Sequence, residues 1–306
     1  MNKHSEKIIE TIIVLKQRGC SFREIESLVG VPKSTVSDIW NRYQKLEELH
    51  PTSKYLFIDI ENAPDLAVSF NRFKANLSQD NIIKEGGWLL SASWRWMFED
   101  QAQGLALTPK EAKASDDKRL VKTISELVEQ ADVVIGHNID GFDFPVVRSR
   151  LVINKLPPMK KVKTIDTLKI ARQMKFQSNR LGSLGIALGE GDKASHSGIN
   201  TWIGCMDGNK ASLEEMLTYN LEDVDLLYRV YMRLRGHDHT PVNAALFSKK
   251  EHMLCPCCGS SNVHETGNTS YTKISEFKEY ECSDCETRVR GRTPINTKAK
   301  RKSLLV

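Results

Sequence analysis

One stretch decides the predicted fold of this chain: Tyr55-Leu56-Phe57-Ile58-Asp59-Ile60-Glu61. Apolar, β-branched and aromatic residues dominate it, and Pro51 and Pro64 bracket it, so it reads as a buried strand. Side chains alternate between the two faces of a strand, which places Asp59 and Glu61 on the same face. Burying two carboxylates is costly unless a cation neutralises them, and Mg²⁺ or Mn²⁺ prefers such oxygen ligands. The alternative is a strand end whose acids face water.

A second group of polar residues follows another predicted strand, the apolar run 132–135. Its loop contains Asn138 and Asp143, and loops at strand ends carry ligand groups in open α/β sheets. Phe142 is expected to anchor the following helix in the core, with Asp143 at that helix's N-terminus, where the helix dipole favours a carboxylate. The alternative is that Asp143 only caps that helix, and Asp140 competes with it as the candidate acid.

A third candidate acid lies on a long helix predicted over 212–234. Tyr219 and Asp223 are four residues apart, so they share one face of that helix. Asp225 competes with Asp223, and a solvent-facing acidic patch would explain both acids without any ligand.

Further elements predict a mixed sheet with helices on its faces, that is, an α/β fold class. The segments 88–98 and 103–108 read as strands that precede a helix over 117–130. Another helix is expected to begin at Thr164. These elements assign residues 54–236 to one domain.

The order Asp-x-Glu, Asn-x-x-x-Phe-Asp and Tyr-x-x-x-Asp resembles the DEDD superfamily of 3′→5′ exonucleases, on the ribonuclease H-like fold. The tyrosine marks the tyrosine subclass, and the pattern is similar to the proofreading domains of family B DNA polymerases. The resemblance implies two Mg²⁺ or Mn²⁺ ions, with Asp59 bridging them. It implies that Glu61 and Asp223 complete the shell of one ion, while Asp143 holds the other. It assigns the orientation of the attacking water to Tyr219.

The first 50 residues predict three short helices, with Gly30 as the break before the third. Ser21 is a candidate N-cap with Glu24 at the capping-box position, and Leu28 is expected on the inner face. The segment from Ser21 onward resembles the homeodomain-like helix-turn-helix modules of resolvases and transposases, which bind duplex DNA. A helical protein-interaction module is the alternative. With Asn138 in the central domain, the candidate nucleic-acid-binding residues are Lys33, Ser34, Thr35, Ser37 and Arg42.

The C-terminal part contains two Cys-x-x-Cys pairs, Cys255 with Cys258 and Cys282 with Cys285. Four thiolates suit one tetrahedral, structural Zn²⁺, and the segments 271–274 and 277–280 alternate as hairpin strands should. The pattern resembles a zinc ribbon over 250–290, followed by a basic tail over 291–306. A redox pair is the alternative, and Cys257 is a spare cysteine that could replace Cys255 or Cys258.

The composition is that of a soluble globular protein, with a net charge of +5, no signal peptide and no membrane-spanning run. The clustered cysteines favour metal binding in a reducing compartment, so a cytoplasmic location is expected. About 70 residues follow Leu234, too few for a polymerising domain. We therefore expect a DNA exonuclease that acts on single-stranded 3′ ends, or one that serves a separate polymerase or recombination complex. A ribonuclease, a structure-specific endonuclease and an inactive DNA-binding regulator are the alternatives.

Overall fold

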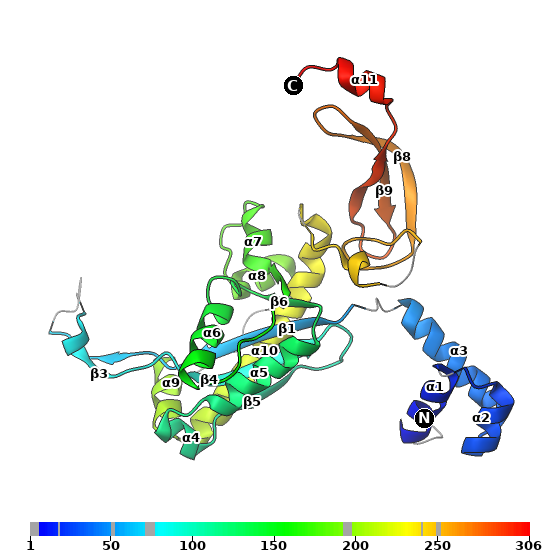
Figure 1. Ribbon diagram of the computed structural model, residues 1–306. Helices are drawn as coiled ribbons and strands as arrows, with labels where there is room; N and C mark the ends of the chain where they lie inside the picture. Colours follow the sequence, from blue (N-terminus) through cyan, green and yellow to red (C-terminus); the bar gives the residue numbers. More distant parts are fainter. Residues whose placement is uncertain are drawn as a thin grey trace.

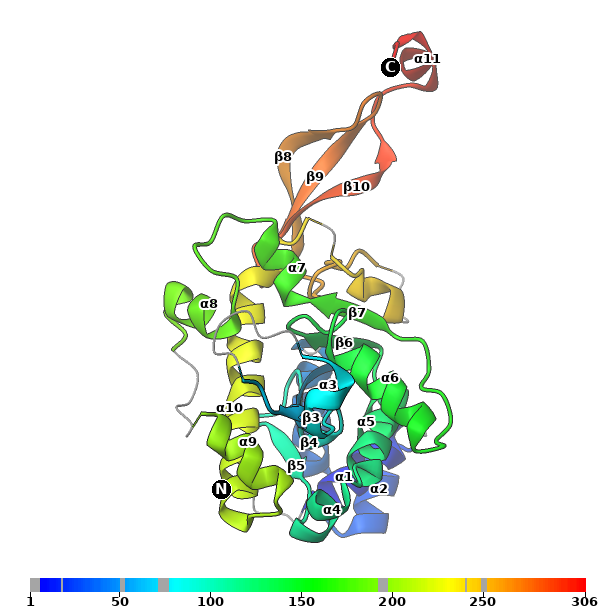
Figure 2. The same cartoon turned by 90° about the vertical axis from the view of Figure 1, so that its left-hand side faces the viewer.

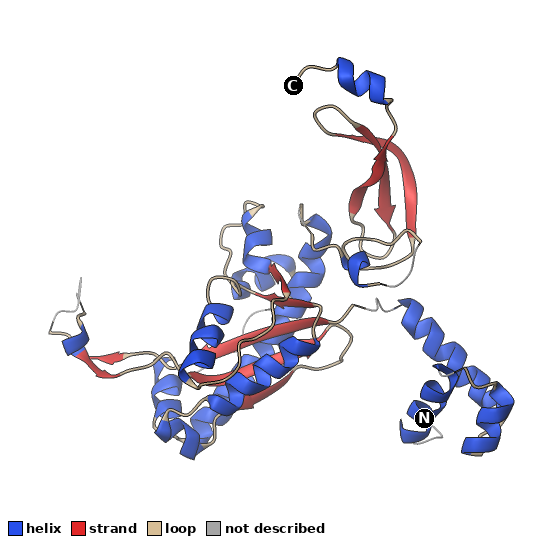
Figure 3. Cartoon of the chain, viewed as in Figure 1, coloured by secondary structure: helices blue, strands red, loops and turns tan. Residues whose placement is uncertain are grey.

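A computed structural model of the protein describes residues 6–17, 19–49, 53–70, 77–191, 198–239, 241–248 and 252–306. Three parts follow one another along the chain: an N-terminal group of helices, a central α/β part and a C-terminal β part (Figures 1 and 3).

The central part is built on a five-stranded mixed sheet with the strand order β5-β4-β1-β6-β7. The middle strand, β1, pairs antiparallel with β4 and parallel with β6, so it is enclosed on both edges. The strands are β1 (Tyr55–Asn62), β4 (Leu89–Trp96), β5 (Gln103–Ala106), β6 (Val133–Gly136) and β7 (Lys163–Asp166). The predicted fold class, a mixed sheet with flanking helices, is confirmed.

Helices cover both faces of this sheet (Figure 2). On one face, α5 and α6 pack against Leu56, Ile58 and Ile60 of β1. On the other face, α7, α8 and the C-terminal half of α10 pack against Tyr55 and Phe57. The helices are α4 (Pro109–Ala114), α5 (Lys118–Gln130), α6 (Asp143–Ile153), α7 (Thr167–Arg172), α8 (Leu181–Leu188), α9 (Ile199–Met206) and α10 (Lys210–Leu234).

Shorter elements complete the central part. A small hairpin of β2 (Leu66–Ala67) and β3 (Ile82–Lys84), with the 3-10 helix η1 (Gln79–Asn81), extends away from the sheet (Figure 1). The 3-10 helices η2 (Arg235–His237) and η3 (Ala244–Phe247) follow α10.

Two local expectations for the central part are wrong. Residues 163–166 form the edge strand β7, and the helix expected from Thr164 begins at Thr167, because 163–166 extends the sheet by pairing parallel with β6. Phe142 is 40% exposed, and the next phenylalanine, Phe144, is buried in the core instead. The turn from β6 into α6 brings the second aromatic ring, and not the first, onto the sheet.

The N-terminal part consists of α1 (Glu6–Gln17), α2 (Phe22–Val29) and α3 (Lys33–Leu49). Its small core contains Ile12, Ile25, Val31 and Val36. The capping box predicted at the start of α2 is present, with Ser21 and Glu24 exchanging hydrogen bonds. Gly30 adopts a left-handed conformation with φ 68°, which ends α2. Leu28 was expected on the inner face, but it is 66% exposed.

The C-terminal part is a three-stranded antiparallel sheet of β8 (Val263–Tyr271), β9 (Glu276–Cys282) and β10 (Arg288–Pro294), followed by α11 (Lys298–Ser303). The hairpin turn occupies 272–275, where Thr272 and Ser275 are hydrogen-bonded, so the strand expected over 271–274 is wrong. The preceding strand, β8, has only polar residues and glycine between Val263 and Tyr271, so it lacks the apolar alternation by which a strand is recognised.

Candidate metal centre

Two of the predicted acids lie on β1 and face α10. Side chains of Tyr55 and Phe57 pack on the α10 side of the sheet, and the alternation of a strand places Asp59 and Glu61 on that same side. Asp59 lies opposite Ser93 of β4, and Glu61 lies near the end of the strand. The apolar first half of β1 therefore anchors two carboxylates at the edge of the core.

The third acid of this cluster comes from α10. Asp223 is fully buried, and ligand oxygens of Asp59, Glu61 and Asp223 all lie within 4.8 Å of one another. Its competitor Asp225 instead forms an ion pair with Arg95, with an N–O distance of 2.6 Å. The structure thus separates the two acids of α10 into one that joins the cluster and one that is neutralised by an arginine.

Tyr219 lies on α10 one turn before Asp223 and is 8% exposed. Its ring packs edge-on against Trp202 of α9, with 6.1 Å between the ring centroids. Trp202 also lines a cavity of about 330 Å³ together with Asn62, Pro64 and Ile199. A largely apolar cavity therefore opens beside the end of β1.

Asn220 is a component of the site that the sequence analysis missed. Its side-chain amide is buried and donates a hydrogen bond to Asp59 Oδ2 at 2.6 Å, while Ser91 Oγ donates to Asn220 Oδ1 at 3.1 Å. A carboxylate accepts hydrogen bonds only, so the direction of this chain from Ser91 to Asp59 is fixed. The available signal was helical spacing: Asn220 lies three residues before Asp223 and shares its buried face.

Asp143 is the first residue of α6 and is 2% exposed. Burial raises its pKa to about 7, although backbone hydrogen bonds at Asp143 itself and at Ile60 oppose that rise. Its oxygens are not among those of the three-acid cluster, but Ile60 lies between Asp59 and Glu61 on β1. The competing acid, Asp140, forms an ion pair with Lys169 at 2.6 Å. The structure therefore brings three of the four acids together and places Asp143 against the backbone between two of them.

Asn138 shapes the loop after β6. Its φ of 68° is in the left-handed region, and its backbone N–H donates to Asp166 Oδ1 at 2.8 Å. The same oxygen of Asp166 accepts a hydrogen bond from Leu168 N, which caps α7. A helix cap is thus a sufficient role for Asp166, and the visible contacts of Asn138 are those of a turn residue.

The chemistry of the acid cluster fits a hard divalent cation. Bringing three carboxylates together with one of them fully buried is unfavourable at neutral pH unless a proton or a cation compensates the charge. Mg²⁺ binds carboxylate oxygens at about 2.0–2.1 Å in an octahedron, so ligand oxygens that share one ion lie about 3–4 Å apart. The ligand atoms of the cluster all lie within 4.8 Å of one another, which is close to that spacing.

A second donor set, of four cysteines, lies at the base of the C-terminal sheet. The sulfur pairs Cys255–Cys285 and Cys258–Cys282 are each 3.6 Å apart. Four sulfurs at about 2.3 Å from a tetrahedral Zn²⁺ would be about 3.8 Å apart, so the set fits that ion. The spare cysteine, Cys257, lies outside the set and donates a hydrogen bond to the Arg235 carbonyl at 3.3 Å.

The predicted DNA-contact residues occupy the start of α3. Lys33 and Ser34 are exposed, and Thr35 and Ser37 are half-buried. Asn41 donates a hydrogen bond to the Ser37 hydroxyl at 3.5 Å. Arg42 lies on α3, but its side chain is outside the described part of the chain.

A model of the RNase_H superfamily matches residues 96–235. That range contains Asp143, Tyr219 and Asp223, and β1 with its two acids precedes it. The five-stranded sheet with its flanking helices is consistent with a ribonuclease H-like fold.

Among solved structures, the chain is similar to the family B DNA polymerase from the hyperthermophilic archaeon Pyrobaculum calidifontis, with 13% sequence identity and a TM-score of 0.43. The similarity covers 61% of this chain and 26% of the polymerase chain, so the matched part spans about a quarter of the polymerase. Identity and TM-score are both too low for this likeness to establish an activity. No curated protein matches the sequence. A search of the described residues for a membrane-crossing helix found none.

Proposed function

We propose that this protein is a metal-dependent nuclease that hydrolyses phosphodiester bonds at the carboxylate cluster of β1 and α10. The observation that carries the proposal is the convergence of Asp59, Glu61 and Asp223 from positions more than 160 residues apart, with ligand atoms within 4.8 Å of one another. The match of residues 96–235 to the RNase_H superfamily supports a nuclease-type function in general.

Two bound Mg²⁺ or Mn²⁺ ions would supply a nucleophilic water and stabilise the entering and leaving oxygens of an in-line displacement at phosphorus. Asp59, Glu61 and Asp223 would hold one ion, and Asp59 would also help to hold the other. Asp143 would bind the second ion directly or through water after losing its proton. Tyr219 would orient the attacking water, because it lies one turn from Asp223 on the same helix.

The proposal extends to the direction of cleavage and to the substrate. The protein is proposed to be a 3′→5′ exonuclease of the DEDD tyrosine subclass that acts on DNA. The cavity beside Trp202 suits a terminal base, since apolar and aromatic groups dominate its lining and Asn62, at the end of β1, borders it. A ribonuclease or an endonuclease would use the same acids, whereas an inactive regulator would bind DNA without consuming it.

The decisive assay follows DNA labelled at the 5′ or the 3′ end in the presence of Mg²⁺ or Mn²⁺. A 3′→5′ exonuclease shortens the 5′-labelled strand stepwise and releases the 3′ label as a mononucleotide. Asp223→Asn should abolish this cleavage, whereas the control Asp225→Asn, two residues away and paired with Arg95, should retain it. Cleavage that survives Asp59→Asn and Asp223→Asn would show that another site, or a contaminant, performs the reaction.

The flanking modules are proposed to bring the nuclease to nucleic acid. A helix-turn-helix over 1–50 would contact duplex DNA through the start of α3, where Lys33 and Ser34 are exposed. Lys33→Ala with Arg42→Ala should weaken duplex binding and lower the slope of log K against log salt by nearly 2, one counterion for each lost contact. An unchanged slope would exclude DNA contact at this position.

The remaining proposals concern cofactors, partners and location. One Zn²⁺ held by the four-cysteine set would stabilise the zinc ribbon over 250–290, which has few buried apolar side chains of its own. The domain limits of 54–236 for the nuclease and 291–306 for the basic tail belong to the same proposal. A polymerase or a recombination complex is the proposed partner, and the cytoplasm is the proposed location.

A further inference from the structure

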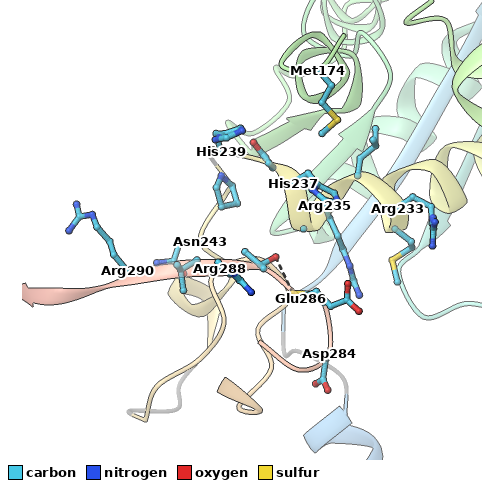
Figure 4. A pocket seen from close by; sticks show the side chains of 18 of the residues that line it. Met174, Arg233, Arg235, His237, His239, Asn243, Asp284, Glu286, Arg288 and Arg290 are labelled. Carbon is cyan, nitrogen blue, oxygen red and sulfur yellow. Dashed lines mark hydrogen bonds between the residues drawn. The ribbon is translucent and has the colours of Figure 1, made fainter. Parts of the chain in front are cut away.

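A cleft of about 1340 Å³ lies between the C-terminal end of α10 and the C-terminal sheet, outside the carboxylate cluster. The close-up shows side chains of α10 and η2 on one side, and those of the loop before β10 and of β10 itself on the other (Figure 4). Basic side chains occur on both sides. They are Arg233, Arg235 and His237 on the α10 side, and Arg288, Arg290 and Arg292 on β10.

The two walls are held together by close contacts at the base of the cleft. Cys257 donates its hydrogen bond to the carbonyl of Arg235, the residue that ends α10. A Cβ added at Gly236 would lie 2.7 Å from the carbonyl oxygen of Cys285, so only glycine permits this approach of the two backbones. The cleft therefore lies where the central part and the C-terminal part are in direct contact.

Arginines occupy three alternate positions of β10, Arg288, Arg290 and Arg292, and are called the ladder below. Arg288, Arg290 and Arg292 are all exposed, and the residues between them are half-buried. Arg288 and Arg290 lie in the regularly paired part of β10, where alternate residues are about 6.6 Å apart. Arg292 follows in the stretch where the pairing with β9 shifts register, between Arg290 and Pro294. Arg290 lies 4.2 Å from the ring centroid of the buried Phe277, which restrains its position. A ladder of this length is too long for one phosphate group and suits a polymer.

Charge in the cleft is positive on balance. Among the residues that the structure describes, five arginines line it against three carboxylates, those of Asp238, Asp284 and Glu286. The carboxylate of Asp284 is already engaged, because Ser260 and Asn262 donate hydrogen bonds to it at 2.5 and 3.1 Å. Arg288 and Arg233 also have ion pairs outside the lining, but both arginines are more than 60% exposed, so these pairs are weak and readily exchanged for phosphate.

We propose that this cleft binds the phosphate backbone of a single nucleic-acid strand, with the ladder on one wall and Arg235 on the other. Arginine is suited to this role because its planar fork donates two parallel hydrogen bonds to phosphate oxygens. The cleft is larger and more polar than a typical small-molecule pocket. Arg235 follows α10 and is twelve positions after Asp223, about 18 Å along the helix axis, so one strand could occupy both places. The proposal rests on the proposed function for the identity of the polymer.

The test measures binding of a fluorescent 30-nucleotide oligo-dT by anisotropy across a salt series, with all proteins in the Asp59→Asn background to prevent cleavage. The ladder variant combines Arg288→Gln, Arg290→Gln and Arg292→Gln. Its charge-matched control replaces three exposed lysines outside the cleft, Lys110, Lys113 and Lys118, by glutamine. A third variant replaces the ladder arginines by lysine, which keeps the charge and shows whether loss of binding reflects misfolding.

Three phosphate contacts to a single strand contribute about 2 to the salt slope, so the ladder variant should lose about that much and bind about 10- to 100-fold more weakly at 0.1 M salt. The lysine variant should retain most of the slope, the lysine control all of it, and Arg235→Gln should lower the slope by about 0.7. Equal losses in ladder variant and control would overturn the proposal. Unchanged binding of oligo-dT by Arg235→Gln would also overturn it, because the strand would then lie outside the cleft. The same holds if the ladder variant binds a duplex probe more weakly but oligo-dT as well as before.

Two further measurements separate the polymer from other polyanions and from the proposed function. The first measurement compares tripolyphosphate with unlabelled oligo-dT as competitors of the fluorescent probe. If both displace the probe equally well, the site is not specific for nucleic acid and the proposal is overturned. Absence of cleavage by the wild-type protein would refute the nuclease assignment, while the ladder-dependent binding of oligo-dT would stand.

Discussion

The hydrogen-bond chain from Ser91 through Asn220 to Asp59 gives the sharpest test of how the site is organised. Replacing Asn220 by leucine keeps the branching at Cγ and the number of side-chain heavy atoms, and removes both hydrogen bonds, at 2.6 and 3.1 Å. Asp59 would then lose the donor that fixes the orientation of its carboxylate. We predict that cation binding and cleavage suffer, because a ligand held by a partner behind it is preorganised for the ion.

The expected size follows from the nature of the lost contact. Loss of a residue that orients a metal ligand typically lowers metal affinity or activity 10- to 100-fold, which corresponds to about 1.4–2.7 kcal/mol. The substitution also leaves the buried Ser91 hydroxyl without its acceptor, which costs about 1–3 kcal/mol of folding stability. One change therefore produces two effects that must be separated.

A second substitution separates them. In Asn220→Leu with Ser91→Ala both partners are apolar, so stability should largely recover, while the metal dependence stays impaired. The assay measures the initial cleavage rate against Mn²⁺ concentration for the wild type, both single variants and the double variant, with thermal unfolding in parallel. The midpoint for Mn²⁺ should rise 10- to 100-fold in both proteins that carry Asn220→Leu, and only slightly in Ser91→Ala. A double variant that recovers activity together with stability would refute the reasoning, since Asn220 would then act on the fold alone.

Three further predictions concern the zinc site, the junction and an ion pair. Cys258→Ser should lose the bound Zn²⁺, whereas Cys257→Ser should retain one equivalent by atomic absorption; loss of zinc in both would contradict the assigned donor set. Gly236→Ala should destabilise the junction of the two parts by about 1–3 kcal/mol and make the C-terminal part more sensitive to limited proteolysis, because the added Cβ meets a carbonyl at 2.7 Å. The pKa of Glu111 is lowered to about 2, first by its hydrogen bonds with Arg119, so its stabilisation is present above pH 4.5 and is lost as the pH falls toward 2. Glu111→Gln can keep the helix cap, and it should lower the free energy of urea unfolding by about 1 kcal/mol at pH 7, a value that allows for solvent screening of Arg119. At pH 3 the loss should be much smaller. An equal loss at both pH values would refute the assignment.

Local sequence was informative wherever a short-range rule governs the backbone. The period of two in β1 placed Asp59 and Glu61 on one face, and the spacing of four on α10 placed Tyr219 beside Asp223. The capping box at Ser21 and the break at Gly30 followed in the same way. These features depend on interactions within a few residues, so the sequence by itself determined them.

The tertiary structure decided which of several equivalent groups take part in the site. Asp225 and Asp140 have the same chemistry as Asp223 and Asp143, but each lies beside a cation brought from another element, Arg95 for the first and Lys169 for the second. The role of Asn220 likewise depends on Ser91, which is distant in sequence and adjacent only through the packing of α10 on β4. Long-range pairing sets these choices, because a carboxylate's charge balance depends on whichever groups the fold brings within a few ångströms, and no local spacing records that.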